Sequence, residues 1–155
     1  MIVDNNLTLS GGISGTGAVS FQTVTGASAV LSTNTVDLLQ ARDVAEGEDL
    51  YLRVQVGTAF AGLTALTIEI VQADDAALST NVVSLGASGA IPVAQLTAGA
   101  RFVIDANPRL ASKGQRYLGA RYTPTGTGTA GTLFADLGLE IQDGQKFYPS
   151  GFAVL

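Results

Sequence analysis

Alternation of apolar and polar residues is the most regular feature of the chain. The segment 50–57 reads LYLRVQVG, with a leucine or valine at every second position up to Val56, and the segment 66–70 reads LTIEI. A period of two places one set of side chains on each face of a β-strand. Both segments are bounded by Gly or acidic turn residues, so we expect two half-buried strands.

Other segments have the same strand character and recur at the spacing of hairpins. They are residues 19–25, 35–39, 81–85, 101–106, 115–123 and 132–142. One helical turn is expected between Ile91 and Gly99, because Pro92 suits a first helical position and Gly99 suits a C-terminal stop. No long helix is available to connect parallel strands. The pattern therefore predicts an all-β protein, a two-sheet antiparallel sandwich of jelly-roll type, with a small β-barrel as the alternative.

A glycine-rich segment, TPTGTGTAGT at residues 123–132, has the G-x-G-x-x-G spacing of a dinucleotide-phosphate loop. That loop requires a helix after the glycines, whose N-terminal amides bind the pyrophosphate. Residues 133–141 instead alternate between apolar and other residues, from Leu133 to Ile141, which is the period of a strand. We therefore expect the glycine-rich segment to be a flexible hairpin loop between two antiparallel strands and not a nucleotide site.

The length of 155 residues fits one domain with a core of its own. We expect residues 1–155 to form a single β-sandwich domain with an extended N-terminal arm at about residues 1–9 and a C-terminal tail at about residues 144–155. The tail concentrates Phe and Tyr beside Pro and Gly from Lys146 onward, whereas disordered tails are polar and poor in aromatics. The tail is therefore expected to dock, on its own domain or on a neighbouring protein.

Composition narrows the chemistry available to the protein. The chain has no cysteine and no histidine, which removes the usual general base near neutral pH and the commonest ligands of transition metals. Charged residues are 14% of the chain, the net charge is −5, and the eight basic residues are scattered. We expect no enzyme activity, no cofactor and no nucleic-acid partner.

Acidic and basic-aromatic pairs offer sites of weak specificity. Asp74-Asp75 and the turn Glu46 to Asp49 carry oxygen ligands but lack the spacing of a calcium loop, so we interpret them as solubilising turns. A glycosidase pair would have to come from strand residues expected on the solvent face: Glu69, Asp105, Asp136 or Glu140.

Two basic-aromatic pairs, Arg116-Tyr117 and Arg121-Tyr122, raise the possibility of base stacking. The two tyrosines are an odd number of residues apart and would face opposite sides of a strand, so we expect one in the core and one at the surface.

The N-terminus gives no sign of an export signal. The opening MIVDNNLTLSGG has no basic region or apolar run of signal-peptide length, and no segment of the chain approaches the roughly 20 apolar residues that span a bilayer. We expect a soluble, unexported protein with no membrane partner.

Several segments are informative through their order and spacing. They are the opening MIVDNNLTLS, the block EDLYLRVQV at 48–56, the segment 91–102, the strand RYL at 116–118 and the late YPSGF at 148–152. Together these segments resemble the capsid cement, or decoration, proteins of tailed bacteriophages, specifically the group typified by the Bordetella phage cement protein. The resemblance spans nearly the whole chain.

The resemblance implies a structural jelly-roll protein that binds the outside of an assembled capsid as a homo-oligomer, a dimer or a trimer, and clamps neighbouring major capsid protein subunits. It implies a virion protein on the capsid exterior, made in the host bacterial cytoplasm. The alternative that we weigh is a carbohydrate-binding or adhesin-type β-sandwich module of a phage tail. The residues expected to contact the capsid or another subunit come from the two termini: Met1, Ile2, Val3, Leu7, Phe147, Tyr148, Pro149 and Phe152.

Overall fold

The two segments with the clearest alternation lie in different sheets that face each other. The computed structural model describes residues 4–41, 49–107 and 114–139. In it, β7 (Tyr51–Val56) and β8 (Ala61–Ala73) occupy the two predicted positions. Every second residue of β7 is buried, and so is every second residue of β8 from Leu66 to Ile70. Both strand predictions are confirmed, and the two strands supply opposite walls of one core.

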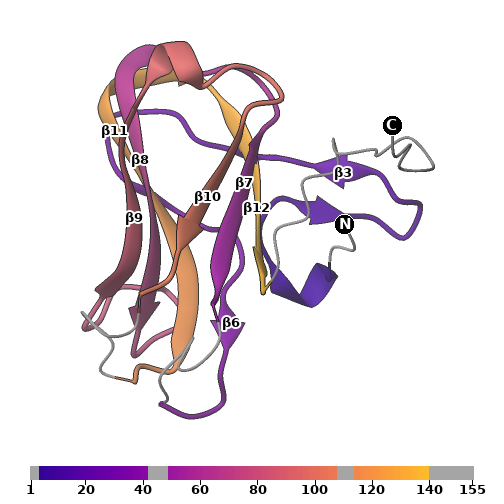
Figure 1. Cartoon of the computed structure of the whole chain (residues 1–155), viewed down its shortest axis with the longest axis vertical. Coiled ribbons are helices and arrows are strands. Elements are labelled where there is room, and N and C mark those ends of the chain that lie inside the picture. Colours follow the sequence, from indigo (N-terminus) through magenta and orange to yellow (C-terminus); the bar gives the residue numbers. More distant parts are fainter. Residues whose placement is uncertain (1–3, 42–48, 108–113, 140–155) are drawn as a thin grey trace, which may run out of the picture.

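Two five-stranded antiparallel sheets make up the sandwich (Figure 1). The first sheet has the order β1 (Thr8–Ser10), β12 (Thr132–Gly138), β7, β10 (Arg101–Asp105), with β4 (Gln22–Thr23) also paired to β12. The second has the order β5 (Val30–Leu31), β11 (Tyr117–Ala130), β8, β9 (Val83–Pro92), with β6 (Val36–Asp37) also paired to β11. The connections β7–β8, β9–β10 and β11–β12 each cross between the sheets, whereas β8–β9 stays within one. This is the strand order of a jelly roll, so the predicted sandwich is confirmed and the barrel alternative is wrong.

The glycine-rich segment is not a hairpin loop, and this prediction is wrong. β11 continues through it to Ala130, β12 begins at Thr132, and the two strands belong to different sheets. Gly131 alone forms the corner between them, with φ 145°, and its carbonyl accepts a hydrogen bond of 3.0 Å from the Val24 amide. The period of two gave the correct strands, but it carries no information about which strand lies beside which. The prediction that no helix follows the glycines is confirmed.

The main core lies between the sheets and includes residues from the N-terminal segment. Leu9, Leu66 and Leu133 have no exposed surface. Tyr122 of β11 is also fully buried, and its hydroxyl is hydrogen bonded to that of Ser10 in β1 over 2.7 Å. Burial raises the pKa of this phenol above its ordinary value. The hydrogen bond therefore links the two sheets through the core, as a buried tyrosine hydroxyl requires.

Hydrogen bonds bridge the two sheets along both long sides of the sandwich. On one side, the Asn107 amide after β10 donates to the Leu85 carbonyl of β9 over 2.7 Å. On the other, the Gln22 side chain of β4 donates to the Leu31 carbonyl of β5 over 2.7 Å and accepts from the Thr33 amide over 3.1 Å. These contacts tie the two sheets together at their margins.

The predicted helical turn is a single 3₁₀ turn, η2 (Val93–Gln95), with Pro92 immediately before it and Gly99 after it at φ 83°. A second 3₁₀ turn, η1 (Asn5–Leu7), precedes β1. A small separate sheet is formed by β2 (Gly12–Ile13) and β3 (Val19–Ser20). Among the described residues, no helix is long and apolar enough to cross a bilayer.

Candidate functional site

Most of the predicted contact residues lie outside the described residues: Met1, Ile2, Val3, Phe147, Tyr148, Pro149 and Phe152. Leu7 is described. It ends η1 and packs, half-buried, against the main core. Thr8 and Leu9, which we assigned to the N-terminal arm, form part of β1 and are buried beside β12. Thr8 and Leu9 are therefore part of the first sheet and not of an extended arm.

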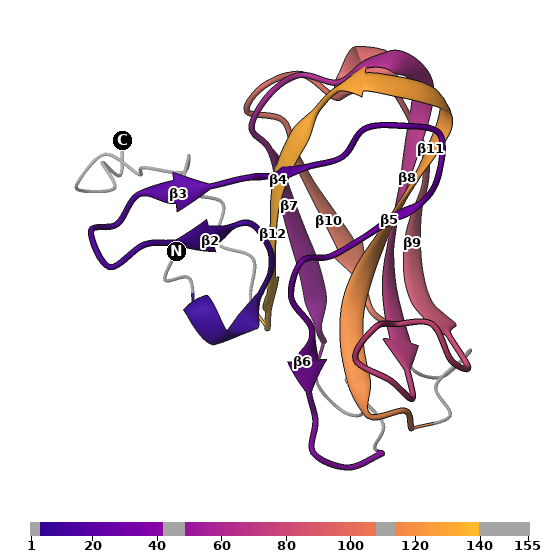
Figure 2. The same cartoon turned by 180° about the vertical axis from the view of Figure 1, so that it is seen from behind.

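The segment that does project is the hairpin of β2 and β3, which extends away from the sandwich in both views (Figures 1 and 2). Residues 12–20 are therefore called the projecting hairpin. Its turn is held by hydrogen bonds from the Ser14 amide to the Ala18 carbonyl and from the Gly17 amide to the Ser14 carbonyl, each 2.9 Å. Both residues of β3 are exposed.

Gly11 fixes the base of the projecting hairpin. It has φ 80°, a conformation that residues with a Cβ rarely adopt. A Cβ at this position would also collide with the Ser20 carbonyl oxygen and contact the ring of Phe134. Glycine at position 11 therefore lets the chain leave β1 sharply and cross the outer face of β12.

A groove opens beside the projecting hairpin. In both views β2 lies between β3 and η1 (Figures 1 and 2), and the space next to it has a volume of about 490 Å³. The groove is lined by amide, hydroxyl, glycine and aliphatic residues without a formal charge: Asn5, Asn6, Thr8, Gly11, Gly12, Ile13, Ser20, Asn34 and Thr35. Its chemistry is therefore that of neutral hydrogen bonding.

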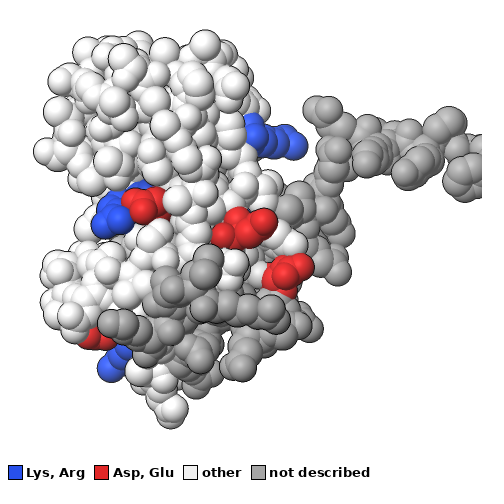
Figure 3. Space-filling view, turned by 60° about the vertical axis from the view of Figure 1, so that its left-hand side comes forward, with Lys and Arg blue, Asp and Glu red and all other residues white. Residues whose placement is uncertain are grey.

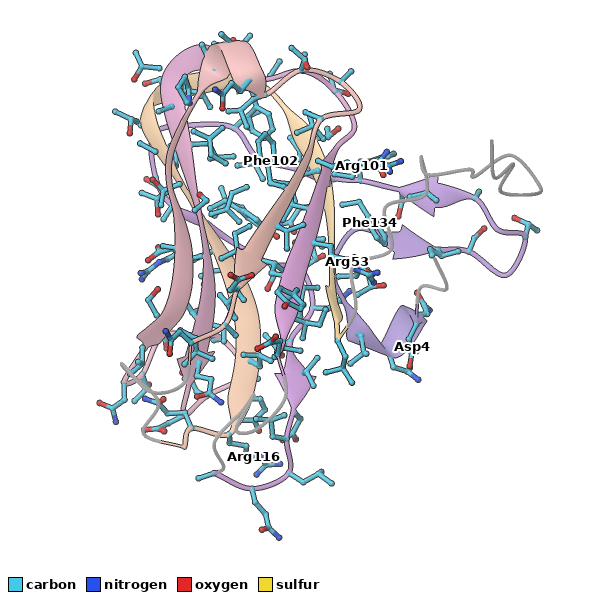
Figure 4. All side chains as sticks on the ribbon, in the orientation of Figure 1. Asp4, Arg53, Arg101, Phe102, Arg116 and Phe134 are labelled. Atoms are coloured by element: carbon cyan, nitrogen blue, oxygen red, sulfur yellow. The ribbon has the colours of Figure 1, made fainter. Side chains whose placement is uncertain are left out.

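The N-terminal segment also covers part of the first sheet's outer face. Phe134 and Asp136 of β12 point away from the core, yet they are only 8% and 2% exposed. Arg53 of the neighbouring strand β7 forms an ion pair with Asp136, and the side chains of Arg53 and Phe134 lie toward the hairpin (Figure 4). The expectation that Asp136 marks a solvent face is wrong, because the covering segment comes from a distant part of the sequence.

Burial is the dominant influence on Asp136. It raises the pKa of the carboxyl above its ordinary value, while the Arg53 guanidinium acts in the opposite direction. The pair does not line the groove, although Thr8, the strand-pairing partner of Asp136 on β1, does.

The residues of the two predicted basic-aromatic pairs interact mainly within the second sheet. Arg121 makes two hydrogen bonds of 2.7 and 3.1 Å to Glu69, its cross-strand partner on β8. This interaction holds the pKa of the Glu69 carboxyl below its ordinary value, against the effect of burial. Tyr122 is in the main core, as predicted. Tyr117 is half-buried and packs against a second, small cluster of Val71, Ala73 and Leu78, so the expected surface ring is partly covered.

Arg116 is similarly paired. Its guanidinium donates to both carboxylate oxygens of Asp37 at 2.7 Å and lies 5.1 Å from the ring centre of Tyr117. The hydrogen bond from Arg116 lowers the pKa of Asp37 to about 2. With Arg53, Arg116 and Arg121 each bound to a carboxylate, these cations are already neutralised by the protein's own acids.

Among the described residues, one end of the sandwich carries no charged side chain. It is formed by the β7–β8 connection, the segment around η2 and the last part of β11, and no Asp, Glu, Lys or Arg occurs in residues 54–68, 76–100 or 122–135. The space-filling view shows a broad white upper region, with the charges gathered lower down and one cation at its side (Figure 3). Arg116 lies at the opposite end (Figure 4). The surface is therefore divided into an uncharged end and a charged end.

The acidic candidates have local structural roles. Asp75 accepts hydrogen bonds from the Ser79 amide (2.9 Å), the Ser79 hydroxyl (2.7 Å) and the Thr80 amide (2.7 Å), and its pKa is lowered, first by the hydroxyl. Asp74 accepts from the Asn81 side chain over 2.6 Å. In the part of the chain that the structure describes, no three metal-ligating side chains are gathered. The acidic stretch before Asp49 and the residue Glu140 lie outside the described residues.

Sequence reasoning placed a strand at residues 19–25, which includes β3, but it missed β2, the hairpin and its groove. Strands of two residues in a Gly- and Ser-rich segment give no periodic signal. A usable signal was the absence of charge, because no Asp, Glu, Lys or Arg occurs from Asn5 to Val36.

Comparison with known proteins gives one family. The family model described as Bbp16 matches residues 19–137. The match begins at β3 and ends within β12, so it includes nearly all of the two sheets, while η1, β1 and β2 precede it. No curated protein matches the chain.

Proposed function

Because the chain belongs to the Bbp16 family, whose namesake is a Bordetella phage protein, we propose that it is a capsid cement protein of a tailed bacteriophage. It binds the outer surface of the assembled shell and clamps neighbouring major capsid protein subunits. It acts as a homo-oligomer, a dimer or a trimer, and performs no chemistry. The observation that carries the proposal is the family match across the sandwich.

The distribution of charge supports a structural binder. Three of the cations are bound to carboxylates of the same chain, and one end of the sandwich presents only neutral residues. Neutral surface can be dehydrated on contact without leaving an unpaired charge behind. Contacts made this way should be less sensitive to salt than contacts between exposed ions.

A clamp can act through individually modest interfaces. An oligomer that touches two or more capsid subunits converts the second contact into an intramolecular one, which raises its effective concentration. The jelly roll suits this role because its two sheets share one core and are bridged by hydrogen bonds along both long sides, which makes it a single compact unit.

Co-sedimentation with shells tests the proposal. Full-length protein is mixed with shells assembled from the major capsid protein encoded in the same genome, at low and high salt. We expect it to pellet with the shells at both salt concentrations, and light scattering should show an oligomer. Failure to pellet under any condition, or a monomer across the micromolar range, would contradict the corresponding part of the proposal.

Truncation separates the predicted terminal contacts from the function itself. Variants that lack residues 1–3 or 144–155 leave every described strand in place. We expect both to remain folded by circular dichroism and to pellet less completely. If both pellet as well as the full-length protein, the termini are not contact segments, and the cement function stands on other surfaces.

The alternative of a tail adhesin finds less support. Sugar-binding sandwiches usually present an exposed aromatic ring to the ligand. Among the described residues, Phe21 is the aromatic side chain with large exposure, at 39%, and its ring packs against Gly57, where an added Cβ would lie 2.6 Å from it.

A further inference from the structure

Both strands of the projecting hairpin have an outer edge that no described strand pairs. In the described part of the chain, β2 and β3 pair only with each other, so each has one edge of N–H and C=O groups without a strand partner. The outer edge of β2 faces η1 across the groove (Figures 1 and 2). An open edge beside a groove is the arrangement that accepts an added strand.

The groove selects for a neutral occupant. Its lining side chains carry no formal charge, and neither does any residue from Asn5 to Val36. A charged side chain placed there would lose water without finding an opposite charge among the lining residues, and an anion would also lie near Asp4, whose carboxylate accepts from the Asn6 amide over 2.9 Å. Asn5 and Asn6 are exposed on the η1 wall, and an asparagine side chain both donates and accepts hydrogen bonds, as a peptide group does.

The frame of the groove is formed before any partner arrives. Gly11 sets the direction in which the hairpin leaves the sheet. On the other side, the Asn34 side chain donates to the Thr8 carbonyl over 3.1 Å, and the Asn34 amide donates to the Leu9 carbonyl over 2.9 Å. A preformed frame lowers the ordering cost of binding.

We propose that the groove between η1 and β2 binds an extended, uncharged segment of a major capsid protein subunit, which adds to β2 as a further strand. This inference rests on the proposed cement function and names the place and the mode of one contact. Main-chain hydrogen bonds to β2 supply the affinity, and the asparagine and hydroxyl side chains of the groove fix the position of the segment.

Site-specific crosslinking tests the proposal on the full-length protein. The chain has no cysteine, so one introduced cysteine gives one labelled position. Asn6→Cys places a benzophenone maleimide on the groove wall, and Gln40→Cys places the same label three residues beyond Asp37, at the charged end of the sandwich; both residues are exposed. After irradiation on shells, we expect the Asn6→Cys protein to crosslink to an uncharged stretch of the major capsid protein, and the Gln40→Cys protein to give no crosslink to that stretch. A crosslink from Asn6→Cys to its own chain or to a second copy would overturn the proposal.

Charge insertion gives a second readout. Asn6→Glu introduces an anion into the groove, beside Asp4, and Gln40→Glu makes the same charge change outside it. We expect Asn6→Glu to bind shells at least about tenfold more weakly than the wild type, with Gln40→Glu retaining more of its binding. Equal binding of Asn6→Glu and wild type would overturn the groove assignment while leaving the cement function intact. If the wild type itself does not bind shells, the proposed function fails first.

Discussion

The sandwich and the projecting hairpin differ in how many strands pair in each sheet and in how far their apolar side chains are buried. In the sandwich, Leu9, Leu66 and Leu133 are fully buried, and each sheet has five strands. In the hairpin, Val19 is 50% exposed and the strands have no partners beyond each other in the described part of the chain. An isolated two-stranded hairpin is marginally stable in water. We therefore expect the sandwich to supply most of the free energy of folding. The hairpin is the region whose outer strand edges can still bind a partner.

This division means that substitutions in the two regions should separate stability from shell binding. Sandwich variants should unfold at lower denaturant concentration. Hairpin variants should unfold almost as the wild type does and differ in what they bind.

The largest effect is expected from Asp136→Ala. The change leaves the Arg53 guanidinium, 12% exposed, without its carboxylate. Breaking a buried ion pair by removing one partner costs about 3–5 kcal/mol, and urea denaturation measures the loss. As the control, the double variant Arg53→Met/Asp136→Leu should recover most of the stability, because well-packed apolar residues often replace a buried pair without loss. A loss well under about 1 kcal/mol in the single variant would show that the pair is not buried in solution.

Gly131→Ala is expected to have the next largest effect. Position 131 has φ 145°, and an added Cβ would overlap the ring of Phe60, which is itself buried. Overpacking of this kind costs about 1–3 kcal/mol. Gly15→Ala in the hairpin turn is the matched control, since nothing lies within 4 Å of its added Cβ, and it should change stability by less than about 0.5 kcal/mol. Equal stability of the two variants would contradict the predicted overlap between a Cβ at position 131 and the Phe60 ring.

Glu69→Gln should give a smaller, pH-dependent effect. The hydrogen bond from Arg121 holds the pKa of Glu69 below its ordinary value of 4.5, so the ionised form is favoured in the folded protein. The stabilisation is therefore fully present above pH 4.5 and is lost as pH falls through the lower folded-state pKa. Melting temperatures of wild type and variant should differ most near neutral pH and converge in acid. A difference in melting temperature that grows as the pH falls would contradict the lowered pKa of Glu69.

The smallest effect on stability is expected from Val19→Ser. Half of this side chain is already in water and it belongs to neither core cluster. The free energy of unfolding should change by less than about 0.5 kcal/mol, as measured by the same urea titration. A larger change would mean that the hairpin packs on the sandwich through Val19.

Local pattern predicted the strands well where a single sheet face is buried. β7 and β10 lie where alternation indicated, because each has one face on the core and the other exposed or half-buried. It failed at residues 123–130, where Thr and Gly continue β11. There the pairing of Gly126 with Leu63, and a bridge between Gly128 and Gly26, hold a strand that has low intrinsic propensity.

The candidate site was less predictable because it depends on contacts between distant segments. Asp136 is buried beside Arg53 and is paired with Thr8 of β1, which lies more than 100 residues earlier in the chain. The groove brings η1 and β2 together with Asn34 and Thr35, and no spacing rule links these positions. The uncharged stretch from Asn5 to Val36 was visible in the sequence, but only the fold showed that several of its residues line one groove.

The central claim is that the protein clamps the shell of a tailed phage from outside. Release of packaged DNA on heating, followed with a fluorescent dye, tests it most directly on particles stripped of the protein and then reconstituted with it. We predict that adding the protein raises the release temperature at both low and high salt, and that the rise saturates at a fixed number of copies per shell. An unchanged release temperature when the protein is bound would contradict the claim.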